Sequence, residues 1–216
     1  MQIVADENIP FAREAFVSYG DVRCYPGRAL TPALVRTADV LLVRSVTTVD
    51  ADLLAGSRVR FVGSATIGTD HVDEAWLRER GIAFAHAPGS NADSVVEYVL
   101  ASLLRLAVRH RTSLRGKKAG IVGCGNIGGR LARRLPALGM EVLCNDPPRA
   151  GAAEAVGRPH AFVSLDAVLA EADVVTLHVP LVRGGAHPTV HLVDTPQLGR
   201  MKPGAWLVNS ARGAAV

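Results

Sequence analysis

The feature that most constrains the fold is the hexapeptide GCGNIG at residues 123–128. It supplies Gly123, Gly125 and Gly128 in the spacing GxGxxG, directly after an apolar run and ahead of a helical pattern. In such a turn the first glycine permits a tight bend, the second lets the backbone approach a pyrophosphate, and the third lets the helix pack on the strand. Asn126 and Ile127 stand where the helix starts, so their N–H groups are the predicted phosphate contacts. The hexapeptide predicts a dinucleotide site.

A carboxylate at the end of the next apolar run supports this interpretation. Asp146 lies 18 residues after Gly128, where its oxygens can accept hydrogen bonds from both hydroxyls of the adenosine ribose. A carboxylate there repels a 2′-phosphate, so the sequence predicts NAD rather than NADP, and Arg149 is the nearby residue that argues otherwise. The alternative is a glycine turn and a surface aspartate in a domain that binds no ligand.

Apolar runs alternate with helical patterns along the whole chain, which is typical of βα units and parallel sheets. Helical stretches are expected at 10–18 and 71–80, for example. Five strands are expected in the second part, whereas a complete dinucleotide fold has six. The expected strands are 2–5, 22–25, 40–43, 60–63 and 82–86 in the first part, and 118–123, 141–146, 161–163, 173–179 and 205–210 in the second.

A long helix is expected from about residue 90 to 110, between the two parts. Ser90, followed by Asp93 three residues later, resembles a capping box. Apolar residues recur at helical spacing, and the resulting face is expected to pack on a domain or on a second subunit. They are Val96, Val99, Leu100, Leu103, Leu106 and Ala107.

Composition excludes several classes of protein. With 216 residues, 49% hydrophobic and 20% charged, the chain is an ordinary globular protein. It has no uncharged apolar run long enough to span a membrane and no secretory signal, so a cytoplasmic location and no membrane partner are expected. Cys24, Cys124 and Cys144 are far apart and are expected to be reduced, and no metal site is predicted.

The net charge of +4 raises the question of nucleic acid. The basic segment 109–118, RHRTSLRGKK, offers a positive patch, but no aromatic residues or DNA-binding motif accompany it. A solvated helix end followed by a loop explains it better, so we expect no nucleic-acid partner.

Three further segments give the chain a family resemblance. Together with the glycine hexapeptide, GSATIGTDHVD (63–73), TLHVPL (176–181) and MKPGAWLVNSARG (201–213) resemble the D-isomer-specific 2-hydroxyacid dehydrogenases over essentially the whole chain. The resemblance implies an NAD-dependent enzyme of α/β class and a homodimer. It implies a flavodoxin-like substrate domain, whose amino-terminal part is residues 1–94, and a Rossmann-type NAD-binding domain at 95–216, incomplete at its carboxyl end.

The resemblance also places substrate residues in the first part. It implies that Ser45, in VRSVT, and Thr66, in SATIGTD, contact the substrate. Arg44 adds charge toward a phosphate or is a surface residue. Without the family match, a hydroxyl at Ser45 or Thr66 is explained equally simply as a turn cap.

Cofactor and catalytic residues follow from the same resemblance. Val179 stands where close relatives carry Thr, so only a main-chain contact to the cofactor is expected there. Ser210, Ala211 and Arg212 match the loop that runs under the nicotinamide, and Arg212 matches the catalytic arginine. Its planar guanidinium suits a substrate carboxylate and a polarised carbonyl oxygen.

Arg212 has hydrogen-bond donors and no acceptor, so another group must remove the hydroxyl proton. In the family this group is a histidine tuned by a carboxylate, downstream of the arginine, whereas the present sequence ends four residues after Arg212. We therefore expect a carboxy-terminal truncation and little activity of the chain alone. His178 is the alternative base. The remaining histidines, expected to be structural or to lie in loops and at helix ends, are His71, His86, His110, His160, His187 and His191.

The predicted substrate is a small phosphorylated 2-hydroxy acid. The segment VRSVT favours a four-carbon acid by resemblance, and a phosphoglycerate or glycerate dehydrogenase is the nearest alternative. A nonenzymatic protein that binds NAD as a signal is a further alternative, but Arg212 argues against it because such a protein has little use for a residue that grips substrate.

Overall fold

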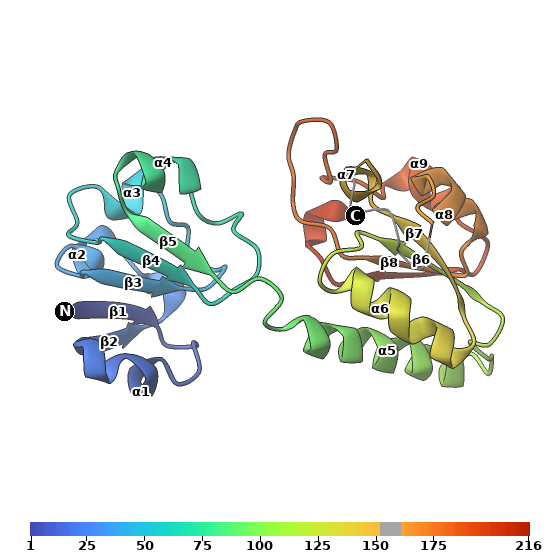
Figure 1. Cartoon of the computed structure of the whole chain (residues 1–216), viewed down its shortest axis with the longest axis horizontal. Coiled ribbons are helices and arrows are strands. Elements are labelled where there is room, and N and C mark those ends of the chain that lie inside the picture. Colours follow the sequence, from blue (N-terminus) through green and yellow to red (C-terminus); the bar gives the residue numbers. More distant parts are fainter. Residues whose placement is uncertain (152–160) are drawn as a thin grey trace. The chain divides into compact units, whose positions relative to one another are not determined.

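The computed structural model describes residues 1–151 and 161–216, which form two compact units, Met1–Ser90 and Asn91–Val216. Each unit is a parallel β-sheet with helices on both faces (Figure 1). The division falls just before the long helix, which belongs to the second unit, whereas the sequence-based boundary was 94/95.

The first unit has a five-stranded sheet in the order β2-β1-β3-β4-β5, with every neighbouring pair parallel. This is the flavodoxin-like order, and it confirms the predicted class. The strands are β1 (Gln2–Asp6), β2 (Asp21–Tyr25), β3 (Val40–Val43), β4 (Phe61–Ser64) and β5 (Ala83–His86). The helices are α1 (Ala12–Phe16), α2 (Pro32–Val35), α3 (Ala51–Leu54) and α4 (Glu74–Glu79), with short 3-10 turns η1 (Val17–Tyr19) and η2 (Gly27–Ala29).

The central strand β3 shows why these runs are strands. Leu41 and Val43 enter the cluster beneath α2, α3 and α4, while Leu42 enters the opposite cluster beside α1. A strand covered on both faces needs apolar side chains at every position, and this is why the run VLLV was recognisable without alternation.

The second unit has a four-stranded parallel sheet in the order β7-β6-β8-β9. This order is the centre of a Rossmann sheet, with β6 as its first strand. The strands are β6 (Lys118–Val122), β7 (Glu141–Asn145), β8 (Val174–Leu177) and β9 (Trp206–Asn209). The helices are α5 (Ala92–Arg109), α6 (Gly128–Arg134), α7 (Pro147–Ala150), α8 (Leu165–Glu171) and α9 (Thr195–Leu198), with 3-10 turns η3 (Leu135–Leu138) and η5 (Gly213–Ala215).

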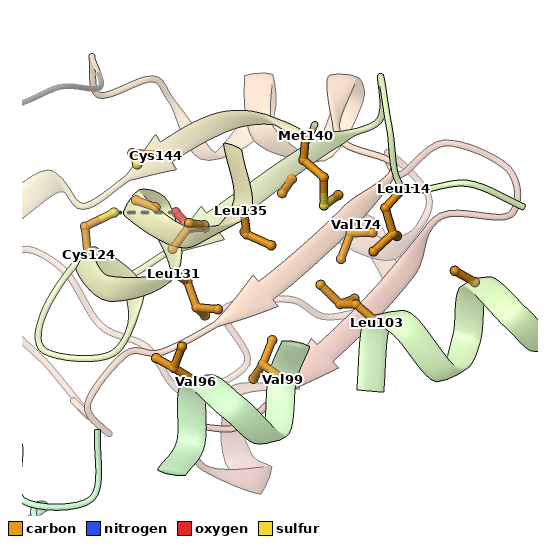
Figure 2. Close-up of a cluster of buried hydrophobic side chains, with 14 residues drawn as sticks. Val96, Val99, Leu103, Leu114, Cys124, Leu131, Leu135, Met140, Cys144 and Val174 are labelled. Atoms are coloured by element: carbon orange, nitrogen blue, oxygen red, sulfur yellow. Dashed lines mark hydrogen bonds between the residues drawn. The ribbon is translucent and has the colours of Figure 1, made fainter. Parts of the chain in front are cut away.

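Helix α5 packs on this sheet together with α6. Val96, Val99 and Leu103 point from α5 into a buried cluster with Leu131 of α6 and Val174 of β8 (Figure 2). Burial of a Val or Leu side chain contributes about 1.5–3 kcal/mol, so this predicted stripe anchors the helix firmly. The opposite face of the sheet is covered by α8, whose buried residues belong to a separate cluster.

Two expectations about local structure are wrong. Residues 161–163 do not form a strand, because Phe162 makes only an isolated bridge to Cys144. The side-chain amide of Asn145 donates to the carbonyl of Val163 (2.8 Å). This side-chain hydrogen bond takes the place of a further backbone hydrogen bond between the two segments. The described sheet therefore has four strands rather than five.

The predicted capping box at the start of α5 is also absent. The N-cap is Asn91, and no side chain makes a capping hydrogen bond there. The carboxylate of Asp93 lies instead 2.7 Å from a guanidinium nitrogen of Arg134 and 3.5 Å from one of Arg130, both on α6. Two long cations on the neighbouring helix attract this carboxylate away from the backbone.

Candidate dinucleotide and substrate sites

Backbone geometry requires glycine at two positions of the glycine loop, residues 123–128. Gly123 has φ +89°, and a Cβ there would lie 2.7 Å from the carbonyl oxygen of His178. A Cβ at Gly128 would lie only 2.0 Å from the carbonyl oxygen of Gly123. At Gly125, in contrast, a Cβ would meet no atom within 4 Å. The loop is therefore packed tightly on the protein side and open at Gly125, where a ligand can approach its backbone.

Asp146 ties the end of β7 to the glycine loop. One carboxylate oxygen accepts a hydrogen bond from the backbone N–H of Cys124 at 2.8 Å. The other accepts from the N–H of Arg149 at 3.2 Å and caps α7, while the Arg149 guanidinium lies 3.5 Å from the oxygen that Cys124 contacts. Only 11% of the Asp146 side chain is exposed. The carboxylate thus holds the loop in place at the position predicted for a ribose contact.

A pocket of about 410 Å³ lies beside this loop. Three arginines are among its lining residues: Arg130, Arg133 and Arg149. Arg130 also donates to the carbonyl of Asn126 at 2.7 Å, which fixes one of these charges against the loop. The positive lining favours phosphate-bearing ligands. The remaining lining residues are Cys124, Gly125, Asn126, Gly129, Ala132, Cys144 and Phe162.

His178 connects the ends of β8 and β9. Its Nε2 lies 2.9 Å from Oγ1 of Thr176, and its Nδ1 lies 2.8 Å from Oγ of Ser210. Burial lowers the pKa of His178 to about 4, so the ring is neutral at pH 7. A group with so low a pKa is a weak proton acceptor, and both its nitrogens already have partners. The geometry favours a structural role over the alternative of a general base.

The turn after β9 presents Arg212 and is held by Asn209. The side-chain carbonyl of Asn209 accepts from the N–H of Ala211 at 3.0 Å, and its amide donates to the carbonyl of Arg212 at 2.9 Å. Val179, after β8, lies against the glycine loop, because its Cγ1 would be 3.0 Å from a Cβ at Gly123. The predicted cofactor residues around His178 therefore gather at the carboxyl ends of β6, β8 and β9.

The residues of the second unit fit a dinucleotide. The open backbone at Gly125 leaves room for a pyrophosphate, and the carboxylate of Asp146 stands at the end of the adjacent strand. Arg130 and Arg149 add positive charge beside the loop. In the described residues no group of three or more His, Cys, Asp and Glu is arranged to hold a metal ion.

The predicted substrate residues belong to the first unit. Ser45 is exposed in the loop after β3, and Arg44 beside it is half-buried. Thr66 is half-buried in the loop after β4, and its Oγ1 lies 2.7 Å from Oγ of the buried Ser64. Ser64 in turn contacts the ring of His71. Each hydroxyl follows the carboxyl end of a parallel strand, which is where open α/β sheets bind ligands.

Three supporting residues of these sites were not predicted: Thr176, Asn209 and Ser64 each orient a predicted residue or its loop. His71 was expected to be structural, and its hydrogen bond to Ser64 agrees with that expectation. All four lie within the segments that carry the family resemblance, but the segments do not show which atoms of these side chains meet. Of the histidines expected in loops, His160 lies outside the described residues.

Comparison with known proteins identifies the family. Residues 99–216 match the model of the D-isomer specific 2-hydroxyacid dehydrogenase, NAD binding domain. The chain belongs to this family. None of the helices described has the length and apolar character needed to cross a membrane.

Over all 216 residues the chain is 64% identical to a protein of Salinibacter ruber named erythronate-4-phosphate dehydrogenase, and 54% identical to one of that name from Azotobacter vinelandii. It covers 55% and 56% of those proteins and so spans about half the length of the curated relatives.

Solved structures confirm the fold. The D-lactate dehydrogenase of Aquifex aeolicus, complexed with NAD and lactic acid, matches with a TM-score of 0.82 and 26% identity over the whole of this chain and 70% of that chain. The pyruvate reductase of Chlamydomonas reinhardtii matches with a TM-score of 0.74 and 27% identity over the whole of this chain and 70% of that one.

Proposed function

We propose that this chain serves the NAD-dependent oxidation of 4-phospho-D-erythronate to 3-hydroxy-2-oxo-4-phosphooxybutanoate, a step of pyridoxal phosphate (vitamin B6) biosynthesis. The observation that carries the proposal is the glycine loop, open at Gly125 and held by Asp146, in a chain with a 64% identical relative named erythronate-4-phosphate dehydrogenase. The alternative substrate is phosphoglycerate or glycerate.

In this reaction the C2–H bond breaks as a hydride leaves, and the C2 hydroxyl loses its proton. When bound, NAD supplies the nicotinamide ring that accepts the hydride. Arg212 is suited to hold the substrate carboxylate through two parallel charge-assisted hydrogen bonds and to polarise the C2 oxygen. Asn209 holds the turn that carries Arg212, so the guanidinium is presented from a fixed backbone.

The proton needs a separate acceptor. The guanidinium of Arg212 has no atom that can accept the proton, and burial lowers the pKa of His178 to about 4. Loss of a positioned base usually costs about 10²–10⁴ in rate. We therefore expect residues 1–216 by themselves to bind NAD and to turn the acid over very slowly.

Binding and turnover test the proposal separately. Calorimetric titration of the chain with NAD and NADP is expected to show tighter binding of NAD, because the Asp146 carboxylate repels a 2′-phosphate. Formation of NADH from 4-phosphoerythronate by the complete enzyme, with 3-phosphoglycerate as the comparison substrate, tests the activity. Faster turnover of 3-phosphoglycerate contradicts the substrate assignment. Absence of NAD binding contradicts the whole proposal.

We further infer that the enzyme is a cytoplasmic homodimer. Support for a second copy comes from α5, where Tyr98, Leu104 and Val108 remain 66%, 48% and 79% exposed. Large apolar side chains along one helix suit an interface between subunits. Cys24, Cys124 and Cys144 are far apart in the sequence and odd in number, which suits a reducing compartment. Analytical ultracentrifugation of the complete enzyme is expected to give twice the monomer mass.

A further inference from the structure

The hydroxyl of Thr66 belongs to a chain of hydrogen bonds at the end of β4, here called the hydroxyl relay. His71 Nε2 lies 3.1 Å from Ser64 Oγ, which lies 2.7 Å from Thr66 Oγ1. Thr66 Oγ1 in turn lies 3.2 Å from the carbonyl oxygen of Gly68. Ser64 and His71 are buried, with 4% and 8% of their surface exposed, while Thr66 is half-buried. The relay thus runs from the core to the surface of the first unit.

Counting hydrogens gives the relay one direction. A hydroxyl carries a single hydrogen, and a backbone carbonyl can only accept. When Thr66 donates its hydrogen to Gly68, Ser64 donates to Thr66. The hydrogen of Ser64 is then used, and His71 must donate to Ser64 from a protonated Nε2. Every bond in the relay points outward from the histidine.

His71 also connects the relay to the other predicted substrate loop. Its carbonyl accepts from the N–H of Val49 at 2.8 Å, and the carbonyl of Val49 accepts from the N–H of Asp73 at 2.8 Å. Val49 and Val72 form a parallel bridge. Val49 ends the loop that carries Ser45. The buried His71 therefore contacts both of the loops that follow the strands β3 and β4.

We propose that Ser64 and His71 are positioning residues that hold Thr66 as a hydrogen-bond acceptor for the C3 hydroxyl of the substrate. The proposal rests on the proposed function, in which Thr66 contacts 4-phosphoerythronate. The Thr66 oxygen has two lone pairs, of which Ser64 occupies one, so one remains for an incoming hydrogen. An ionised phosphate or carboxylate has no hydrogen to donate, which excludes these groups as the partner of Thr66.

Between the two substrate hydroxyls, chemistry favours the one at C3. The C2 oxygen becomes a carbonyl during the reaction and then can only accept, so a fixed acceptor beside it would face another acceptor. The C3 hydroxyl keeps its hydrogen in both substrate and product. 3-Phosphoglycerate has no separate C3 hydroxyl, and the relay would therefore select the four-carbon acid.

The direction of the relay can be measured without turnover. Long-range ¹H–¹⁵N correlation spectra of the chain labelled at histidine report which ring nitrogen carries the proton, and the His71→Gln variant assigns the signal. We expect the proton of His71 on Nε2. A neutral ring protonated on Nδ1 overturns the proposed direction.

The substrate contact requires kinetics on the complete enzyme. Thr66→Val is expected to raise KM for 4-phosphoerythronate about three- to tenfold, the usual cost of one hydrogen bond, while the KM for the 3-deoxy analogue and both kcat values change little. Ser64→Ala is expected to raise the same KM. Thr66→Ser, which keeps the hydroxyl, is expected to keep the preference for the hydroxylated acid. Ser57→Ala, a serine outside the relay, is the matched control. Thermal melting of each variant checks its fold.

An equal rise of KM for both acids overturns the assignment of the C3 hydroxyl. If the His71→Gln variant, whose amide can still donate, keeps the preference while His71→Phe loses it, the positioning role stands. If both lose it equally, the role is overturned. A wild-type enzyme that does not oxidise 4-phosphoerythronate overturns the proposed function and the substrate hydroxyl with it, whereas the ring-proton measurement decides the direction of the relay on its own.

Discussion

The glycine loop and the hydroxyl relay both follow the carboxyl end of a parallel strand, yet they are built from different parts of the chain. In the glycine loop the backbone does the shaping, because Gly123 and Gly128 have no space for a side chain. In the relay the side chains of Ser64, Thr66 and His71 hold one another. The loop built from backbone tolerates no added atom at Gly123 and Gly128, whereas the relay built from side chains is sensitive to a lost one.

The largest expected effect is an added methyl group in the glycine loop. Gly128→Ala places a Cβ 2.0 Å from the carbonyl oxygen of Gly123, so we expect unfolding free energy to fall by about 3 kcal/mol or more and NAD binding to be lost. Gly125→Ala is the matched control. Its Cβ meets no protein atom, so stability should change by less than about 0.5 kcal/mol.

NAD affinity of the Gly125→Ala variant is nevertheless expected to fall about 10- to 100-fold, because the methyl group blocks charge-assisted hydrogen bonds to the pyrophosphate. Urea unfolding and calorimetric titration measure the two effects separately. Equal destabilisation of both variants would show that the loop is not shaped as described.

A smaller effect is expected at Asp146, whose carboxylate accepts a hydrogen bond from the glycine loop. Asp146→Ala removes the acceptor for the N–H of Cys124 and the predicted ribose contact. We expect NAD to bind about 10- to 100-fold more weakly and NADP to be affected less, since the carboxylate that repels its 2′-phosphate is gone. Titration with both dinucleotides measures this. An equal loss for both would contradict the assigned role in cofactor choice.

His178, in the second unit, is also held by side chains, as His71 is in the relay. Its burial makes the free energy of unfolding depend on pH. Its pKa is lowered to about 4 in the folded chain, from 6.5 in the unfolded chain. Between these values the unfolded state binds a proton that the folded state does not, so stability is unaffected by His178 above pH 6.5 and falls as the pH drops toward 4. The loss amounts to up to about 3 kcal/mol.

His178→Gln should remove most of this dependence. Urea unfolding of both proteins at pH 7.5, 5.5 and 4.5 is the measurement, and the two stability curves should converge at low pH. Curves that stay parallel would show that burial does not hold the ring neutral.

The smallest effect is expected at Asp93, on the surface of the second unit. Its pairing with Arg134 is exposed, so Asp93→Asn should cost less than about 1 kcal/mol, and the loss should vanish in 1 M salt. A capping role would leave a loss that salt does not screen. Thermal melting at low and high salt separates these two roles.

Much of the fold was predictable from sequence because its strands are covered on both faces. Runs such as VLLV at 40–43 have no polar alternation and were located correctly, as β3 shows. The short segment 161–163 was misjudged because one bridge and the side chain of Asn145 replace a ladder there, and sequence gives no sign of that. The cap of α5 was misjudged because Asp93 is drawn to arginines that stand far away in sequence.

The sequence by itself determined where the backbone must bend and approach a ligand, because an absent Cβ at Gly123 and Gly128 is written directly in the residue type. It also determined the carboxylate at Asp146 by its distance from that turn. Only the tertiary structure decided that the N–H of Cys124 reaches Asp146 and that Ser210 reaches His178, because the pairing of parallel strands brings together residues that are far apart in the sequence. The direction of the hydroxyl relay depends on three contacts at once, and although their residues are near one another in the sequence, only the folded loop after β4 decides which of their atoms meet.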